Sequence, residues 1–349
     1  MFRKKIVISL VIFCAIVLLS GCLKKESLEE MDVPQNEDAI KTSEDVSEYG
    51  EEDGSEMVAR DLYFIDAHGM VASQTIELPL EESMKVATQV MEHLIVDGPG
   101  SSIVPNGFRG VLPEGTEILG INVQEDGTVI VDVSEEFKEY APEDEIRILE
   151  AMTYSLTQFE SIDTIRLQIN GHEQHVMPVN GTPIGKGYTR NRGINVVQTD
   201  TTDFLQSEAV TVFYPTEYND NRYYVPVTQY ISQHETNKYE SLVNALIEGP
   251  KYHTLQVTHV FNPQTTLTSE PSLTDGILEI EFNDRILKET DEGVISDEVM
   301  ETLVRTLTDD DAVEAVRVKV ENVETIQSES GKLYDEPVTN EQFLPKEKL

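Results

Sequence analysis

Residues 94–99 read Leu-Ile-Val-Asp-Gly-Pro, and residues 246–250 read Leu-Ile-Glu-Gly-Pro. Each stretch follows apolar residues at helical spacing, so each is predicted to end a helix. Glycine can adopt the left-handed conformation just beyond the last turn, and the proline after it cannot continue the helix. The return of this helix end after about 150 residues indicates that one structural unit occurs twice in the chain.

Other segments repeat in the same order and at nearly the same spacing. They are Leu62-Tyr63-Phe64 with Val212-Phe213-Tyr214, Leu78-Pro79-Leu80 with Val225-Pro226-Val227, Asp126-Gly127 with Asp275-Gly276, and Ile165 to Ile169 with Val316 to Val320. A length of 349 residues also suits two domains of ordinary size. We therefore predict a first half over residues 61–184, a connector over 185–208, a second half over 209–340 and a tail over 341–349.

Both halves show one order of expected elements: two strands, a helix, two strands, a helix and a last strand. In the first half these are strands over 61–66 and 74–80, a helix from Met84 to Leu94, a hairpin over 118–133 that turns at Asp126-Gly127, a helix from Pro142 to Phe159 and a strand over 165–169. In the second half they are strands over 210–214 and 222–227, a helix from Tyr239 to Ile247, a pair of strands that turns at Asp275-Gly276 and whose second strand is 277–280, a helix after Ser296 as N-cap and a strand over 316–320. This order predicts an α+β fold class of two tandem repeats, each a small sheet with two helices on one face.

The N-terminus has the pattern of a bacterial secretion signal over residues 1–21. Arg3, Lys4 and Lys5 precede an apolar run from Ile6 to Leu19, and small residues follow it. The run is shorter than the roughly 20 residues that a membrane-spanning helix needs, which favours a cleaved signal. The alternative is an uncleaved N-terminal anchor.

The sequence Leu19-Ser20-Gly21-Cys22 resembles the lipobox of bacterial lipoproteins. The resemblance implies that Cys22 is acylated, with palmitate among the expected chains, and that the signal is cut just before it. Two or three acyl chains anchor a protein durably, whereas one does not. Cys14 would be removed with the signal, so the mature chain would carry no free thiol, and we expect it on the extracytoplasmic face of the cell membrane.

Residues 22–60 are predicted to form a disordered acidic tether. From Leu23 to Arg60 there are thirteen acidic and four basic residues with almost no apolar pattern. The alternative is a segment that binds a basic partner. The whole chain carries a formal net charge of -39, which disfavours binding to nucleic acid.

Several motifs are similar to the GerM domain family. They are Leu94 to Pro99, Leu112-Pro113-Glu114-Gly115-Thr116, Val131 to Phe137, and Thr153 to Gly171. The second half departs from this pattern: Asn283 stands where the first half has Ser134, and Ser269 to Leu273 replaces the Leu-Pro-x-Gly-Thr piece. A binding property of the first half therefore need not be shared by the second.

This resemblance implies a non-enzymatic lipoprotein of spore-forming bacteria that acts as an assembly or scaffold component in sporulation and spore germination. It also implies a fold like that of ring-building modules of secretion machines and a place in the complex that links mother cell and forespore. The expected partners are other channel or envelope proteins of sporulation, further copies of the chain in rings, and the membrane through the lipid. In a sporulating cell the expected location is the space between the membranes of the developing spore.

The residues themselves predict no catalytic, cofactor-binding or metal-binding set. Only His172 and His175 are closely spaced histidines, and on a strand that spacing places them on opposite faces. The acidic runs Ser134-Glu135-Glu136, Glu143-Asp144-Glu145 and Asp309-Asp310-Asp311 are interpreted as helix starts, turns and solvated faces, with weak binding of divalent cations open at the last.

Two hypotheses remain. In the first, the chain is a scaffold that contacts partners through exposed strand edges and a basic patch of Lys186, Arg190 and Arg192, although these charges also suit an ordinary connector. In the alternative, it is a cell-surface hydrolase or a ligand-binding lipoprotein that acts on cell wall. The alternative predicts a deep cleft between the halves with converging carboxylates.

Overall fold

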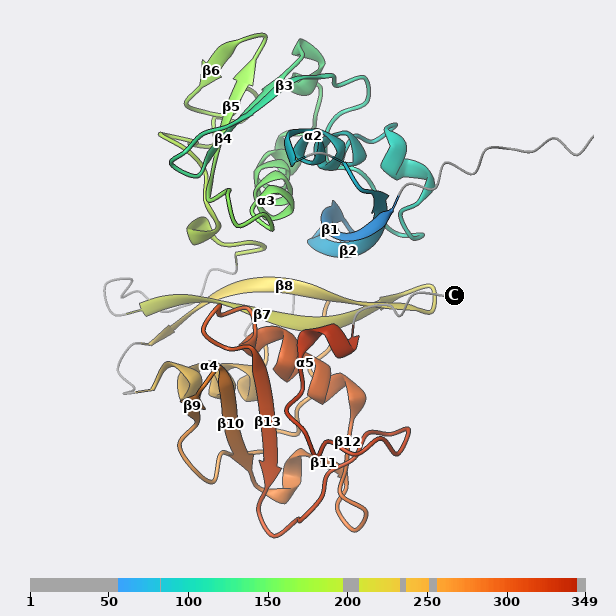
Figure 1. Ribbon diagram of the computed structural model, residues 1–349, viewed down its shortest axis with the longest axis vertical. Coiled ribbons are helices and arrows are strands. Elements are labelled where there is room, and N and C mark those ends of the chain that lie inside the picture. The colour runs from blue at the N-terminus through green and yellow to red at the C-terminus, as the bar shows by residue number, and fades with distance from the viewer. Residues whose placement is uncertain (1–55, 82, 197–206, 233–236, 251–255, 344–349) are drawn as a thin grey trace, which may run out of the picture. The chain divides into compact units, whose positions relative to one another are not determined.

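The computed structural model describes residues 56–343 except 82, 197–206, 233–236 and 251–255. The expected signal segment, Cys22, the tether up to residue 55 and the end of the tail lie outside the described residues. Figure 1 shows the arrangement of the described elements. None of the described helices is both long and apolar enough to cross a membrane.

The first half contains two helices, a hairpin and a mixed sheet. Its elements are β1 (Met57–Ile65), β2 (Val71–Pro79), α2 (Ser83–His93), η1 (Pro99–Ser102), β3 (Ile118–Val123), β4 (Thr128–Val133), η2 (Glu135–Lys138), η3 (Pro142–Asp144), α3 (Glu145–Leu156), β5 (Thr164–Ile169), β6 (His172–Gln174) and η4 (Arg190–Arg192). The sheet has the strand order β3-β4-β5-β6, and β1 and β2 pair only with each other.

The helix α3 is the crossover between the two parallel strands of this sheet. Strands β4 and β5 pair from Thr128 with Thr164 to Val133 with Ile169. Alternate side chains of both strands are buried, as expected when helices cover one face of a sheet. On its other side α3 contacts β1, so the helices lie between the sheet and the hairpin (Figure 1).

The second half repeats this plan with small additions. Its elements are β7 (Ser207–Tyr218), β8 (Asn221–Ser232), α4 (Lys238–Glu248), β9 (Ser272–Thr274), β10 (Ile277–Phe282), η6 (Asp284–Ile286), β11 (Leu287–Glu289), β12 (Val294–Ile295), α5 (Asp297–Leu307), β13 (Ala315–Val320) and η7 (Asn340–Phe343). Strands β10 and β13 are parallel with α5 between them in the chain, and β9 pairs with β10 on the other side. Helix α5 contacts the β7–β8 hairpin, as α3 contacts β1.

The two-repeat α+β fold expected from the sequence is confirmed, with one refinement. The first two strands of each half form a separate hairpin and do not join the sheet. The hairpin covers the apolar side of the helices that faces away from the sheet. Leu62 and Phe64 of β1 are completely buried there, and each such side chain contributes about 1.5–3 kcal/mol to stability.

Two boundaries differ from those expected. Strand β1 begins at Met57, inside the segment predicted as tether, because β2 runs on to Pro79 and pairs with it. The described part of the connector is no loose linker: Tyr188 pairs with Ile165 at the edge of the sheet, and Tyr188 and Ile194 are buried in the first half's core.

The glycines of the two Gly-Pro pairs are required for different reasons. Gly249 has a φ of 76° and ends α4 in the left-handed conformation, as expected. Gly98 has a φ of -76°, so the expected left-handed conformation is wrong for this residue. A Cβ at Gly98 would lie 2.4 Å from the carbonyl oxygen of Glu92. Close approach of two backbone segments therefore requires the glycine.

Candidate ligand site between the two halves

A buried carboxylate joins the two halves at one end of their junction. Asp66 follows β1, and its Oδ1 accepts the N–H groups of His68 and Met70 at 2.9 and 2.8 Å. Its Oδ2 accepts the hydroxyl of Tyr223, from β8 of the second half, at 2.9 Å. The Tyr223 ring also packs edge-on against Phe108, with the ring centroids 4.6 Å apart.

Asn195, at the end of the described connector, makes a second polar link. Its Oδ1 accepts the Val71 N–H at 2.9 Å, and its Nδ2 donates to the Val71 carbonyl at 2.7 Å. The same Nδ2 donates to the carbonyl of Pro226 in β8 at 2.7 Å. One side chain therefore holds β2 of the first half and β8 of the second, and its φ of 46° allows this geometry.

Glu150 of α3 lies beneath this link and is only 3% exposed. Its Oε1 accepts the Asn195 N–H at 3.1 Å. Burial raises the pKa of Glu150 to about 7, although the Asn195 N–H and the nearby Arg147 both oppose the increase. The junction thus contains a carboxyl group that titrates near neutral pH.

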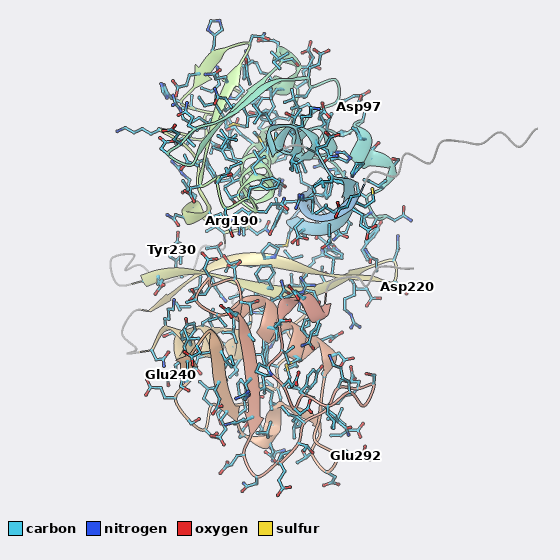
Figure 2. All side chains as sticks on the ribbon, in the orientation of Figure 1. Asp97, Arg190, Asp220, Tyr230, Glu240 and Glu292 are labelled. Atoms are coloured by element: carbon cyan, nitrogen blue, oxygen red, sulfur yellow. The ribbon has the colours of Figure 1, made fainter. Side chains whose placement is uncertain are left out.

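Beside the junction lies a cavity of about 1140 Å³ with walls from both halves. The first half contributes the end of α3, the segment before β5 and the connector around Arg190, which Figure 2 labels. The second half contributes the start of β7, the start of α4 and the turn after α5. Most of its lining side chains are polar, with threonines, one arginine, one lysine and several acids.

Arg190 is held against the end of α3. Its Nε donates to Oγ1 of Thr157 at 2.6 Å, its Nη2 donates to the carbonyl of Tyr154 at 3.2 Å, and its guanidinium lies 4.5 Å from the centre of the Tyr154 ring. A cation is favourable there because the carbonyl end of a helix carries partial negative charge. In the described part of the chain, Nη1 of Arg190 has no hydrogen-bond partner.

The three acids after α5 have different surroundings. Asp310 is used within its own half: it forms an ion pair with Lys238, and its Oδ2 accepts the Tyr239 hydroxyl at 3.0 Å. Asp309 has no hydrogen bond or ion pair to any described residue, although it lines the cavity. Asp309 is exposed to solvent.

The cavity offers charged and hydroxyl groups that can bind a polar ligand. The described lining residues include no histidine or cysteine that could serve as a base or a nucleophile. They do provide a cation on the wall from the first half and an unpaired anion on the wall from the second. Hydroxyl groups and the rings of Tyr154 and Tyr239 complete the surface.

The residues singled out in the sequence are placed as follows. Arg192 is exposed and donates to the carbonyls of Pro183 and Ile184 at 3.1 and 3.2 Å, whereas Arg190 is half-buried and packs on α3. Lys186 is exposed, and so are His172 and His175. Within the described residues, no group of three His, Cys, Asp or Glu side chains is placed to hold a metal ion.

Sequence reasoning missed the junction and half of the cavity. The interpretation of Asp309 to Asp311 as a solvated turn agrees with the exposure of Asp309 and Asp311. Nothing in the sequence indicated that Arg190 lines the same cavity. Glu150 carried a signal that was available, because it interrupts the apolar run Ile148, Leu149, Ala151 and Met152. The position of Asn195 depends on contacts between residues that are 124 apart in the sequence, Val71 and Asn195.

Comparisons with known proteins agree on one family. The family model described as "Germane: Sporulation and spore germination" matches residues 61–175 and 211–325. The chain is 39% identical over 343 residues to the spore germination protein GerM of Bacillus subtilis (strain 168), with 93% of each chain covered. The solved tandem GerMN domains of the sporulation protein GerM from Bacillus subtilis match with a TM-score of 0.74 and 40% identity, over 81% of this chain and 97% of that one. The first GerMN domain of the same protein matches at 50% identity over 38% of this chain and 98% of its own, with a TM-score of 0.36.

Proposed function

Because the chain belongs to the Germane family of sporulation and spore germination proteins, we propose that it serves there as a lipid-anchored scaffold without enzymatic activity. Its proposed partners are envelope proteins of the complex that links mother cell and forespore, together with further copies of the chain in a ring. The relatives are named for sporulation and germination and not for a reaction. The junction supports a scaffold role, because it joins two domains into one unit that presents fixed surfaces.

A difference between the two halves carries this proposal. In the first half Ile146, Val176 and Val179 are 47%, 50% and 38% exposed, and we call them the apolar patch. Two of them lie on neighbouring segments, because the Glu145 carboxylate beside Ile146 accepts the Val179 N–H at 3.1 Å. Exposed apolar side chains that gather on one surface are typical of a protein–protein contact.

The second half has polar residues at the same places. The shift of 151 residues that relates Arg166 to Arg317 places Asp297 at the position of Ile146 and Gln327 at that of Val176. The loop that matches Val179 contains Glu329, whose N–H donates to Asp297 at 3.2 Å. One fold therefore carries an apolar surface in the first copy and a polar one in the second, which supports partner binding by the first half. The net charge of -39 favours a partner segment with apolar side chains flanked by Lys or Arg.

This surface is tested by placing the polar residues of the second half at the equivalent positions of the first half. The double variant Ile146→Asp, Val176→Gln should lose its crosslinks to envelope proteins in sporulating cells, with the amount of chain unchanged. Leu333→Gln is the matched control, because Leu333 is 51% exposed on the second half and its variant should keep the crosslinks. An unchanged set of crosslinked proteins in the double variant would refute this role of the apolar patch.

The anchor is tested separately, since Cys22 lies outside the described residues. The Leu-Ser-Gly-Cys sequence motivates the proposal that this thiol is acylated. Replacement of Cys22 by Ala should release the chain from the membrane fraction or block its maturation. An identical mass and identical membrane partitioning in the variant would rule out lipidation at this residue.

The cavity favours a second candidate function. A cell-surface hydrolase or ligand-binding lipoprotein acting on cell wall requires a cleft between the halves with acids in its walls, and the cavity with Asp309 and Asp311 has this character. Release of soluble fragments from purified cell wall by the purified chain would support a hydrolase. The absence of such fragments, with a ligand bound, would favour binding alone.

A further inference from the structure

The cavity places two opposite charges on opposing walls without joining them. Arg190 comes from the connector of the first half and Asp309 from the turn after α5 of the second. The two side chains form no ion pair within 4.0 Å. A charged side chain without a partner in the protein is available to a charged group of a ligand.

Besides Asp309, the cavity is lined by Asp163, Glu208, Asp310 and Asp311, of which Asp310 already has partners. Asp310 is occupied by Lys238 and Tyr239, and Lys238 is thereby neutralised. Arg190 is fixed by Thr157 and Tyr154 but keeps Nη1 unpaired with respect to the described residues. A guanidinium is suited to a carboxylate, and a lone carboxylate is suited to an ammonium group.

The volume of the cavity limits the size of the ligand. A cavity of about 1140 Å³ is large for a single amino acid and lies near the upper end of pockets that hold a molecule of a few residues. The threonines around it and the Tyr154 and Tyr239 rings can contact a peptide backbone and small side chains. A short peptide offers one group of each sign, a terminal carboxylate for a guanidinium and a terminal ammonium group for a carboxylate.

We propose that this cavity binds a short zwitterionic peptide, with its carboxylate on Arg190 and its terminal ammonium group on Asp309. The inference goes beyond the scaffold role and is independent of the apolar patch, which lies on another surface. It gives the ligand-binding alternative a defined chemical class. Failure of one proposal therefore leaves the other standing.

The test is a titration of the purified full chain, in detergent, with trialanine and with two derivatives that each lack one charge. N-acetyl-trialanine lacks the ammonium group and trialanine amide lacks the carboxylate. We expect trialanine to bind and each derivative to bind about tenfold more weakly, since one charged hydrogen bond is lost in each. Absence of trialanine binding at millimolar concentration overturns the proposal.

A variant cycle assigns the two ends. Asp309→Asn should weaken the binding of trialanine about tenfold. It should leave the binding of N-acetyl-trialanine unchanged, because that peptide already lacks the ammonium group that Asp309 contacts. Asp309 has no partner among the described residues, so this variant should fold normally. Asp291→Asn, in an exposed loop of the second half, is the control that should alter neither affinity. An equal loss for both peptides in Asp309→Asn would contradict the assignment.

Two further measurements complete the experiment. Arg190→Gln should weaken the binding of trialanine but not that of trialanine amide. The thermal unfolding of this variant must be checked, because Arg190 also packs on α3. A peptide ending in D-alanyl-D-alanine, compared with the all-L peptide, distinguishes a source in wall stem peptides from one in proteins. Tighter binding of the D-form points to wall peptide, and tighter binding of the L-form points to protein fragments.

Discussion

Among single residues, Glu150 has the clearest consequence for stability. Its pKa is about 7 in the folded chain and near 4.5 in the unfolded chain. The folded state therefore holds the proton more tightly, and the free energy of unfolding falls as pH rises from about 4.5 to about 7. Above that range the carboxylate is charged and buried, with the Asn195 N–H and the nearby charge of Arg147 as partial compensation.

Glu150→Gln should remove this pH dependence. The variant should match the wild type in urea unfolding at pH 4 and exceed it by about 3 kcal/mol above pH 7, since each pKa unit corresponds to 1.36 kcal/mol. Glu301→Gln is the matched control, because Glu301 occupies the equivalent place in α5 and pairs with Arg305 at 2.8 Å near the surface. A stability difference for Glu150→Gln that does not grow between pH 4 and pH 7 would contradict this account.

At the scale of elements, Glu145 shows how one helix end organises a loop. Its Oε2 accepts the Tyr140 hydroxyl at 2.8 Å and the N–H groups of Val179 and Asn180 at 3.1 and 2.6 Å, and its Oε1 accepts the Thr182 N–H at 2.7 Å. Burial alone would raise the pKa of Glu145, but these hydrogen bonds outweigh it and hold the pKa below its usual value of 4.5. The carboxylate thus fixes the loop that carries part of the apolar patch.

Glu145→Gln should cost about 2–3 kcal/mol at pH 7, because a neutral amide replaces a charged acceptor of several hydrogen bonds. The loss should shrink as pH falls below 4.5, where the wild-type carboxylate becomes protonated. Hydrogen exchange at the amides of 179–182 should become faster in the variant. Glu143→Gln, two residues earlier and exposed, serves as control. Unchanged exchange at the loop in Glu145→Gln would show that the carboxylate does not hold the loop.

At the scale of the whole molecule, the junction decides whether the two domains unfold together. Asn195 alone supplies three side-chain hydrogen bonds that connect β2 with β8. Their loss leaves the backbone groups of Val71 and Pro226 without partners. Two compact domains joined by a weaker interface are expected to unfold independently.

Asn195→Ala should therefore lower the stability by about 2–4 kcal/mol and separate a single unfolding transition into two, as measured by calorimetry. Tyr223→Phe, which removes the bond to Asp66, should act in the same direction. Asn191→Ala, exposed in the same connector, should leave the transition unchanged. A single sharp transition in both junction variants would show that other contacts couple the domains.

The sequence predicted most of the elements, because their signals are local. The Asp275-Gly276 turn is an example: both residues have positive φ, of 49° and 76°, as a tight hairpin turn requires. The spacing of apolar residues predicted the helices, and the Gly-Pro pairs predicted where two of them end. The sequence pattern predicted a left-handed conformation for Gly98, which is wrong. The glycine is required because this turn packs closely against the Glu92 carbonyl of the helix.

The sequence predicted only part of the candidate site. Arg190 and the Asp309-Asp310-Asp311 run were both noticed in the sequence, but as separate features. Lys186 and the two arginines were predicted as one basic patch, whereas Arg190 and Arg192 each donate to backbone or hydroxyl oxygens nearby. A sequence shows which charges exist, and it does not show which of them are already paired.

The amino-acid sequence by itself determined that this chain repeats one α+β unit and which family it resembles, because helix ends, turns and alternating strands are set by interactions between near neighbours. The tertiary structure alone decided how the hairpins cover the helices, that Asn195 ties β2 to β8, and that Arg190 faces Asp309 across a cavity. The physical reason is that these features arise from contacts between residues far apart in the sequence, 92 positions for Tyr63 with Ser155 and 124 for Val71 with Asn195, for which no periodic pattern in the chain exists.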